Sequence, residues 1–231
     1  MPRFLLLSLS LGGLLLGLRP HAGEGQSVPS PYRFFETKQE GGAFLGHTNQ
    51  GTGRFGYGPG SGLTVGARYG LHLGGPFGIE GVFGYRPTTR DVVDPTREEG
   101  NRVVGETDAE IMSIDVRLRF SLTGDRIWHR LNPFVFAGGG LAWDLAGDGE
   151  ADGLVLPQDQ FEFGRRFLGL FGAGVRWIVS EDILIRGDLA LTLNQLETPE
   201  GFLDPARELD RVGEKEWVSG PLFSLGIAYH F

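Results

Sequence analysis

Along most of this chain, large apolar residues alternate with small or polar ones, a pattern typical of β-strands rather than helices. In the clearest stretch, residues 182–195, Ile185 and Leu189 fall on one face while Arg186 and Asp188 fall on the other. A helical period would mix these two sets. The alternation predicts eight strands, near residues 34–47, 61–73, 76–88, 106–122, 132–145, 165–179, 182–195 and 217–231.

Three of the predicted strands fit the alternation less well. In the fifth, Phe134 and Phe136 sit on the face that should be polar. In the sixth, Leu168 and Leu170 interrupt the polar face in the same way. The first strand is the weakest assignment, and its inner face is expected to carry Glu36, Lys38 and Glu40.

The connections between the predicted strands alternate in length. Those after the second, fourth and sixth strands are short to moderate, namely Gly74-Gly75, residues 123–131 and Ser180-Glu181. Those after the first, third, fifth and seventh strands are long, roughly 13 to 21 residues, and rich in Asp, Glu, Gly and Pro. An up-and-down barrel with both termini on one side would gather every long loop at the opposite end.

The amino-terminal segment has a different pattern. Met1-Pro2-Arg3 precedes an apolar run over residues 4–18 and a polar break, which is typical of a secretory signal peptide. The run is shorter than the roughly 20 apolar residues that a membrane-spanning helix needs. We therefore expect a cleaved signal peptide at residues 1–25 and one mature domain at residues 26–231.

The chain ends in a strand-like segment that closes on an aromatic residue. Its apolar positions alternate as Phe223, Leu225, Ile227, Tyr229 and Phe231. This ending resembles the carboxy-terminal signal that the assembly machinery of bacterial outer-membrane β-barrels reads. Together with the signal peptide and the loop lengths, it makes nearly all of the mature sequence similar to the small outer-membrane barrels typified by the transmembrane domain of outer membrane protein A.

The resemblance implies an all-β fold, an eight-stranded antiparallel up-and-down transmembrane β-barrel with short periplasmic turns and long external loops. It implies a place in the outer membrane of a Gram-negative (diderm) bacterium, in contact with outer-membrane lipid and lipopolysaccharide. It also implies that the barrel assembly machinery is a partner through the carboxy-terminal strand.

A secreted soluble barrel of the lipocalin kind would fit the same alternation with its two faces exchanged. The polar faces carry Arg together with Asp or Glu, and lysine occurs only at Lys38 and Lys215. The planar guanidinium of arginine suits buried pairing with carboxylates. This favours a barrel whose polar face points inward.

Composition narrows the possibilities further. The chain has no cysteine, so its fold does not depend on disulfides, and its 39 glycines suit tight turns and strands crowded around a narrow barrel. The formal net charge of -8 argues against a nucleic-acid partner.

The inner faces of the predicted strands carry many charges. In a barrel of eight strands, side chains fill the interior, so we expect these charges to pair with one another and to support the fold. A narrow porin-like channel for ions or small solutes is the alternative. The expected charge network comprises Arg68, Glu80, Arg86, Asp115, Arg117, Arg119, Arg176, Arg186 and Asp188.

Candidate chemistry outside the lumen is sparse. A lipid A deacylase would need a His, a Ser and a carboxylate together on the outer face, and His47 with Thr48 and Asn49 is the nearest candidate. One acidic loop approximates an EF-hand calcium loop, although its flanks are strands. Its candidate ligands are Asp148, Glu150, Asp152 and Asp159.

These observations favour a non-enzymatic outer-membrane protein without a cofactor, which has a structural or surface-interaction role. The mixed-charge loops over residues 89–105 and 197–216 are the expected sites for an external partner. A narrow channel is the first alternative and a lipid-modifying enzyme of the lipid A deacylase type is the second.

Overall fold

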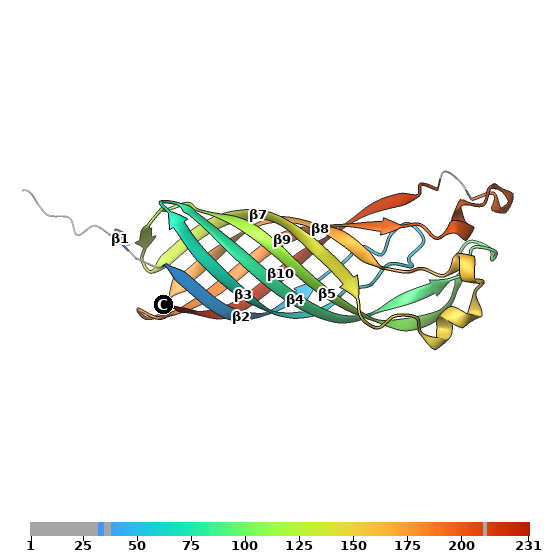
Figure 1. The fold of residues 1–231 in the computed structure, drawn as a ribbon, viewed down its shortest axis with the longest axis horizontal. Coiled ribbons are helices and arrows are strands. Elements are labelled where there is room, and N and C mark those ends of the chain that lie inside the picture. Colours follow the sequence, from blue (N-terminus) through green and yellow to red (C-terminus); the bar gives the residue numbers. More distant parts are fainter. Residues whose placement is uncertain (1–31, 35–37, 210–211) are drawn as a thin grey trace, which may run out of the picture. The chain divides into compact units, whose positions relative to one another are not determined.

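The computed structural model describes residues 32–34, 38–209 and 212–231, and within them eight long strands close into an antiparallel barrel (Figure 1). Each strand pairs with the next along the barrel wall, β2 pairs with β10, and β7 pairs with β8. The barrel strands are β2 (Gln39–Thr48), β3 (Gly62–Gly74), β4 (Phe77–Val93), β5 (Val103–Ser121), β7 (Leu131–Asp144), β8 (Arg165–Ile178), β9 (Ile183–Glu197) and β10 (Lys215–His230).

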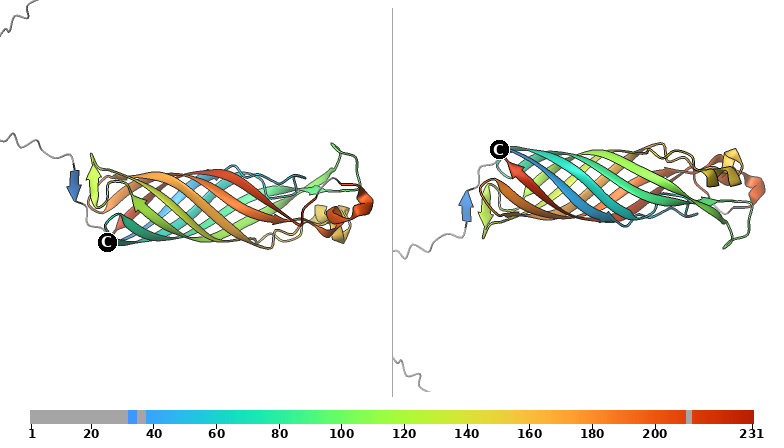
Figure 2. Two further views of the ribbon diagram at one scale, coloured as in Figure 1. Left: turned by 90° about the horizontal axis from the view of Figure 1, so that it is seen from above. Right: turned by 90° about the horizontal axis from the view of Figure 1, so that it is seen from below.

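Shorter elements lie at the two ends of the barrel. At the end where β10 finishes, β1 (Tyr32–Phe34) pairs with β6 (Arg126–Trp128) (Figures 1 and 2). At the opposite end, the loops contain four 3₁₀ turns (Figure 2). These are η1 (Glu150–Leu154), η2 (Pro157–Asp159), η3 (Glu200–Leu203) and η4 (Pro205–Arg207).

The eight predicted strands are confirmed, with small changes in their bounds. The largest changes are five residues each: β2 starts at Gln39 rather than near residue 34, and β4 continues to Val93 rather than ending near residue 88. β5 starts at Val103, three residues before the predicted start. The pairing of β4 with β5 runs on from Pro87↔Glu110 with one irregularity near Val92. The predicted signal peptide at residues 1–25 and the position of Glu36 lie outside the described residues.

In the part of the chain that the structure describes, no helix is long and apolar enough to cross a membrane.

The two faces of the barrel wall differ as the alternation predicted, with large apolar side chains outside and charges inside. On β5, for example, Ile114, Val116 and Leu118 are each more than half exposed, whereas Asp115 and Arg117 are 3% and 5% exposed. A soluble barrel of the lipocalin kind would require the reverse. That alternative is therefore wrong, because water cannot solvate a continuous apolar outer surface of this size at acceptable cost.

The apolar outer surface forms a belt of defined height. On β4 it runs over residues 77–87 and on β5 over residues 112–121. Nearer the start of β5, beyond the belt, Glu106, Asp108 and Glu110 face outward. Strands of about 11 residues tilted near 45° rise about 25 Å, which is the height of the apolar band of outer-membrane barrels. The remaining parts of β4 and β5 form a hairpin that projects beyond this belt.

The glycine content follows from the tight curvature of the wall. At Gly140, a Cβ atom would lie 2.0 Å from the carbonyl oxygen of Ile114 and 2.6 Å from the Cα of Asp115. At Gly66, it would lie 2.2 Å from the carbonyl oxygen of Phe83. Only glycine lets these neighbouring strands approach so closely on the inner side.

Candidate functional site: the charged lumen and its cap

Two buried glutamates form the centre of a charge network inside the barrel. The Nη1 of Arg119 lies 2.7 Å from Glu40 Oε1 and 2.5 Å from Glu80 Oε1. The Nη1 of Arg186 lies 2.6 Å from Glu80 Oε1 and 3.5 Å from Glu40 Oε1, and Arg176 lies 2.8 Å from Glu40 Oε2. Glu40 therefore binds arginines from three strands that do not neighbour β2, and Glu80 binds one arginine from the adjacent β5 and one from β9 across the lumen.

The network continues around the wall through Asp188. Its carboxylate accepts hydrogen bonds from Arg186 on the same strand at 2.8 Å and from Arg68 at 2.5 Å, and Ser224 lies 3.5 Å away. Arg176 also donates to Asn132 Oδ1 at 2.7 Å. The network thus touches every strand of the barrel, through Glu40 (β2), Arg68 (β3), Glu80 (β4), Arg119 (β5), Asn132 (β7), Arg176 (β8), Arg186 and Asp188 (β9), and Ser224 (β10).

Aromatic rings support the guanidinium groups from within the lumen. The guanidinium of Arg186 stacks 4.4 Å from the centre of the Phe134 ring, and that of Arg68 lies 4.6 Å from the Phe44 ring. Arg117 lies over Phe136 at 5.4 Å. The sequence left Phe134 and Phe136 unexplained on a polar face, and cation–π contact with buried arginines is their physical reason.

The predicted charge network divides into three parts in the structure. Arg68, Glu80, Arg119, Arg176, Arg186 and Asp188 join the central network. Asp115 and Arg117 form a separate pair on β5, with Nε and Oδ1 2.6 Å apart. Arg86 points into the same lumen and, among the described residues, has no hydrogen-bond or ion-pair partner.

Sequence reasoning missed three members of the central network, of which Ser224 is the most peripheral. Glu40 was expected on an inner face but not as a centre of pairing, and Asn132 was not singled out at all. The signal for Glu40 in the sequence was its place just before the alternating run of β2, and the structure adds that it lies in register with Gly70 of β3. Because a bare glycine faces it, the glutamate side chain has room to reach across the lumen.

Aromatic residues from three loops close the other end of the lumen. Tyr57 is 1% exposed and packs against Phe161 and Phe202 at ring distances of 4.7 and 5.5 Å, with Phe55 against Phe202 at 5.0 Å. Its hydroxyl donates to Thr198 Oγ1 at 3.4 Å, and burial raises the pKa of that hydroxyl. We call Phe55, Tyr57, Phe161 and Phe202 the aromatic cap. Apolar residues of the inner wall continue the packing below it, including Ala109, Ile111, Ala142, Leu168 and Leu170.

The acidic loop that resembled a calcium site uses its carboxylates differently. Asp152 is buried, bonds to Arg90 at 2.7 Å and accepts the amide hydrogen of Gly149 at 2.7 Å. Asp159 is also buried and pairs with Arg207 of a second loop. Among the described residues, no group of three or more His, Cys, Asp or Glu is arranged to hold a metal ion, so Asp148, Glu150, Asp152 and Asp159 do not converge. The two buried carboxylates instead tie the loop to its neighbours.

His47, the nearest candidate for lipid chemistry, lies on the exposed face of β2. Its register partners on the neighbouring strands are Phe223 and Leu63. These two apolar neighbours, one on each side of His47, supply neither the serine nor the carboxylate that a deacylase would require.

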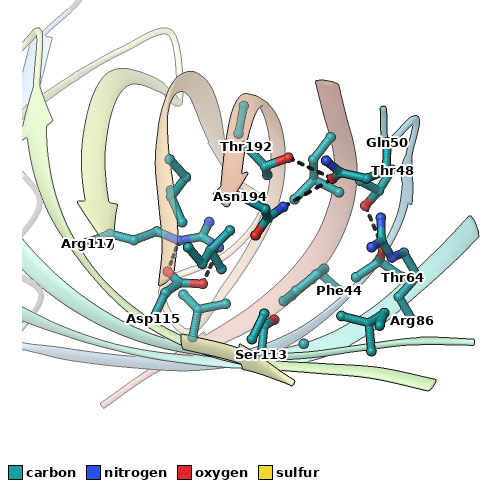
Figure 3. A pocket seen from close by; sticks show the side chains of 18 residues that line it. Phe44, Thr48, Gln50, Thr64, Arg86, Ser113, Asp115, Arg117, Thr192 and Asn194 are labelled. Carbon is teal, nitrogen blue, oxygen red and sulfur yellow. Dashed lines mark hydrogen bonds and ion pairs between the residues drawn. The ribbon is translucent and has the colours of Figure 1, made fainter. Parts of the chain in front are cut away.

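A cavity of about 60 Å³ lies inside the barrel wall (Figure 3). Its polar lining includes Arg86, Arg117 and Asp115, and its apolar lining includes Phe44 and Leu168. Thr48 and Thr64 share a hydrogen bond of 2.8 Å on one side of it, and Asn194 lies 3.3 Å from Gln50 on another.

No protein-family model matches the chain, and no curated protein matches its sequence. Among solved structures, it is similar to Neisserial surface protein A at 11% identity, covering 87% of this chain and 98% of that chain, with a TM-score of 0.49. It is similar to the N-terminal β-barrel domain of OprF from Pseudomonas aeruginosa at 11% identity, covering 85% and 100%, with a TM-score of 0.44. A third structure is Ail of Yersinia pestis in complex with the heparin analogue sucrose octasulfate, at 14% identity, covering 84% and 99%, with a TM-score of 0.39.

The barrel's own surfaces define its class. The wall is closed, its outer face carries an apolar belt of membrane height, and its charges are buried inside. The chain is therefore a small eight-stranded β-barrel protein of the bacterial outer membrane.

Proposed function

We propose that this chain is a non-conducting, non-enzymatic outer-membrane barrel, which stabilises the envelope and presents a rigid loop surface outside the cell. The observation that carries the proposal is the charge network, in which ion pairs and hydrogen bonds cross the lumen and touch all eight strands. When side chains from all eight strands bind one another across the lumen, they fill it.

The energetics of the network support a closed barrel. Arg186 and Glu80 are each 1% exposed, so breaking their contact would remove one counterion from each of two buried charges, which would keep only Asp188 and Glu40 beside Arg186 and Arg119 beside Glu80. Removing one member of a buried pair costs about 3–5 kcal/mol. An ion that crossed the lumen would have to displace several such pairs at once, and the aromatic cap would still stand in its way.

The surface available to a partner lies beyond the apolar belt. An open groove of about 870 Å³ runs between the projecting part of β5 and the loop that contains η1. Glu106, Asp108, Glu110 and Glu150 line it, which would suit a partner with a basic surface. Arg90 on β4 pairs with Asp152, and Arg207 in η4 pairs with Asp159. Both carboxylates belong to the loop that contains η1, so the two ion pairs hold this loop in one arrangement, as a binding surface requires.

The ends of the chain support a route to this location. In the proposed route, residues 1–25 direct export and are removed, and the assembly machinery recognises the alternating residues 223–231. These residues lie on β10, which closes the barrel against β2. The ring of Phe231 packs 6.2 Å from that of Tyr229 and 6.3 Å from that of Tyr69, at the rim of the apolar belt.

A narrow channel is the second candidate, and one feature favours it. A smaller space of about 10 Å³ lies on the other side of the network, lined by Arg119, Arg176 and Asn132 among others. If the central ion pairs exchanged partners, this space and the 60 Å³ cavity would lie on one path.

Single-channel recording separates the two candidates. The mature chain is folded in detergent, checked by its heat-dependent shift on a gel, and added to a planar bilayer. We expect no current steps from the folded protein, because the network and the cap close the lumen. Regular steps that appear only with the folded form would overturn the proposal in favour of the channel.

A further inference from the structure

Arg86 is the one charged side chain of the predicted network that stands alone. It lies on the inner face of β4, is 7% exposed and lines the cavity of Figure 3. Among the described residues, no carboxylate pairs with it and no carbonyl accepts a hydrogen bond from it. A buried charge without a partner is strongly unfavourable, so native structures normally neutralise it.

The cavity beside Arg86 has a net positive lining. Arg86 and Arg117 contribute two positive charges, and Asp115 contributes one negative charge, which leaves one positive charge. The Asp115 carboxylate is already engaged by Arg117 through both oxygens, at 2.6 and 3.1 Å. It is therefore not available as a counterion for Arg86.

The same cavity contains hydrogen-bond donors that have no acceptor. The amide nitrogen of Gln50 is buried and has no hydrogen-bond partner within the described part of the chain. Thr48 and Thr64 bond to each other at 2.8 Å, so whichever hydroxyl accepts still has its own proton to donate. Ser113 adds a third hydroxyl to the lining.

From these observations we propose that the lumen holds a small monovalent inorganic anion, of the halide class, bound between Arg86 and the hydroxyl and amide donors around it. The volume of about 60 Å³ is room for roughly four to six water molecules, so a chloride ion fits with part of its hydration shell. Water alone would satisfy the donors but would leave the charge of Arg86 uncompensated. The charge network and the aromatic cap lie on either side of this cavity.

The test is to fold the full mature chain in sodium chloride and, separately, in sodium gluconate of equal ionic strength, and to measure the urea midpoint of unfolding in each. Gluconate is too large for the cavity. We expect the wild-type midpoint to rise with chloride and then to level off. A ligand at 100 times its Kd shifts the unfolding equilibrium about 100-fold.

Two variants make the test specific. Arg86→Gln should lose the chloride dependence and, in gluconate, should be more stable than the wild type, because it removes an uncompensated charge. Arg165→Gln, at an exposed position on β8, should keep the wild-type dependence. An equal chloride effect in all three proteins, or no effect in the wild type, would overturn the proposal.

A second measurement does not depend on any variant folding. Crystals of the wild-type protein folded in sodium bromide should show an anomalous scattering peak within contact distance of the Arg86 guanidinium. A peak there supports the anion site, and its absence from a well-ordered lumen contradicts it.

Discussion

Glu40 holds three arginines that come from three different strands, namely Arg119 on β5, Arg176 on β8 and Arg186 on β9. With Glu80 and Asp188, three carboxylates face four arginines in the central network. The sequence could predict that these residues point inward, because alternation assigns faces. It could not predict the partners, because pairing across a lumen depends on the stagger of strands that are distant in sequence.

Close strand contact at Gly140 gives a prediction at the scale of one residue. Gly140→Ala should lower the free energy of unfolding by about 1–3 kcal/mol, because its Cβ would overlap the backbone of β5. Urea unfolding in lipid vesicles measures the change. Gly81→Ala is the matched control, since a Cβ there meets nothing within 4 Å, and it should stay within about 0.5 kcal/mol of the wild type. A Gly140→Ala variant as stable as this control would show that the wall is not as crowded as described.

At the scale of the element, the strands were predictable and their full lengths were not. Lipid-facing and lumen-facing residues alternate over the belt, and that alternation located all eight strands. Beyond the belt, β4 and β5 face water on one side and loops on the other, so outward charges such as Glu106 and Asp108 replace the apolar residues. A strand without an apolar face resembles a loop in sequence, which is why residues 89–93 and 103–105 of the projecting hairpin were missed.

The turn of this hairpin gives a prediction on pH. Asp94 accepts hydrogen bonds from the hydroxyl of Thr96 at 2.6 Å and from its amide at 2.9 Å, and Arg97 lies 3.4 Å away. These contacts hold the pKa of the Asp94 carboxyl below its ordinary value of 3.8. Because the pKa of Asp94 is lower in the folded turn than in the unfolded chain, the ionised carboxylate stabilises the turn at pH values above 3.8. This stabilisation is lost as the pH falls through the folded pKa.

Hydrogen exchange at the Thr96 amide measures this effect. Corrected for intrinsic rates, protection should be constant down to about pH 4 and should fall only in more acidic solution. In Asp94→Asn the acid-dependent fall should be absent. Loss of protection in the wild type near neutral pH would contradict the role assigned to Asp94.

At the scale of the whole molecule, the apolar belt fixes how the barrel sits in lipid. Val116 lies near the middle of the belt and is 53% exposed when no lipid surrounds the barrel, so its side chain faces the acyl chains. Val116→Arg should therefore lower the free energy of unfolding from vesicles by about 2–4 kcal/mol. Asp108→Arg, on the same face of β5 but above the belt, should cost little. If the two variants lost equal stability, the belt would not be the membrane-facing surface.

The most direct test of the account is the unfolding free energy of a double-mutant cycle on Arg186 and Glu80, whose contact at 2.6 Å lies at the centre of the network. Arg186→Met and Glu80→Met should each lower the free energy of unfolding by about 3–5 kcal/mol, because each removes a counterion from a buried charge and unbalances the charge of the lumen. The double variant should cost clearly less than the sum, since the net charge of the lumen is then restored. Simple additivity of the two losses would contradict a barrel held closed by its charge network.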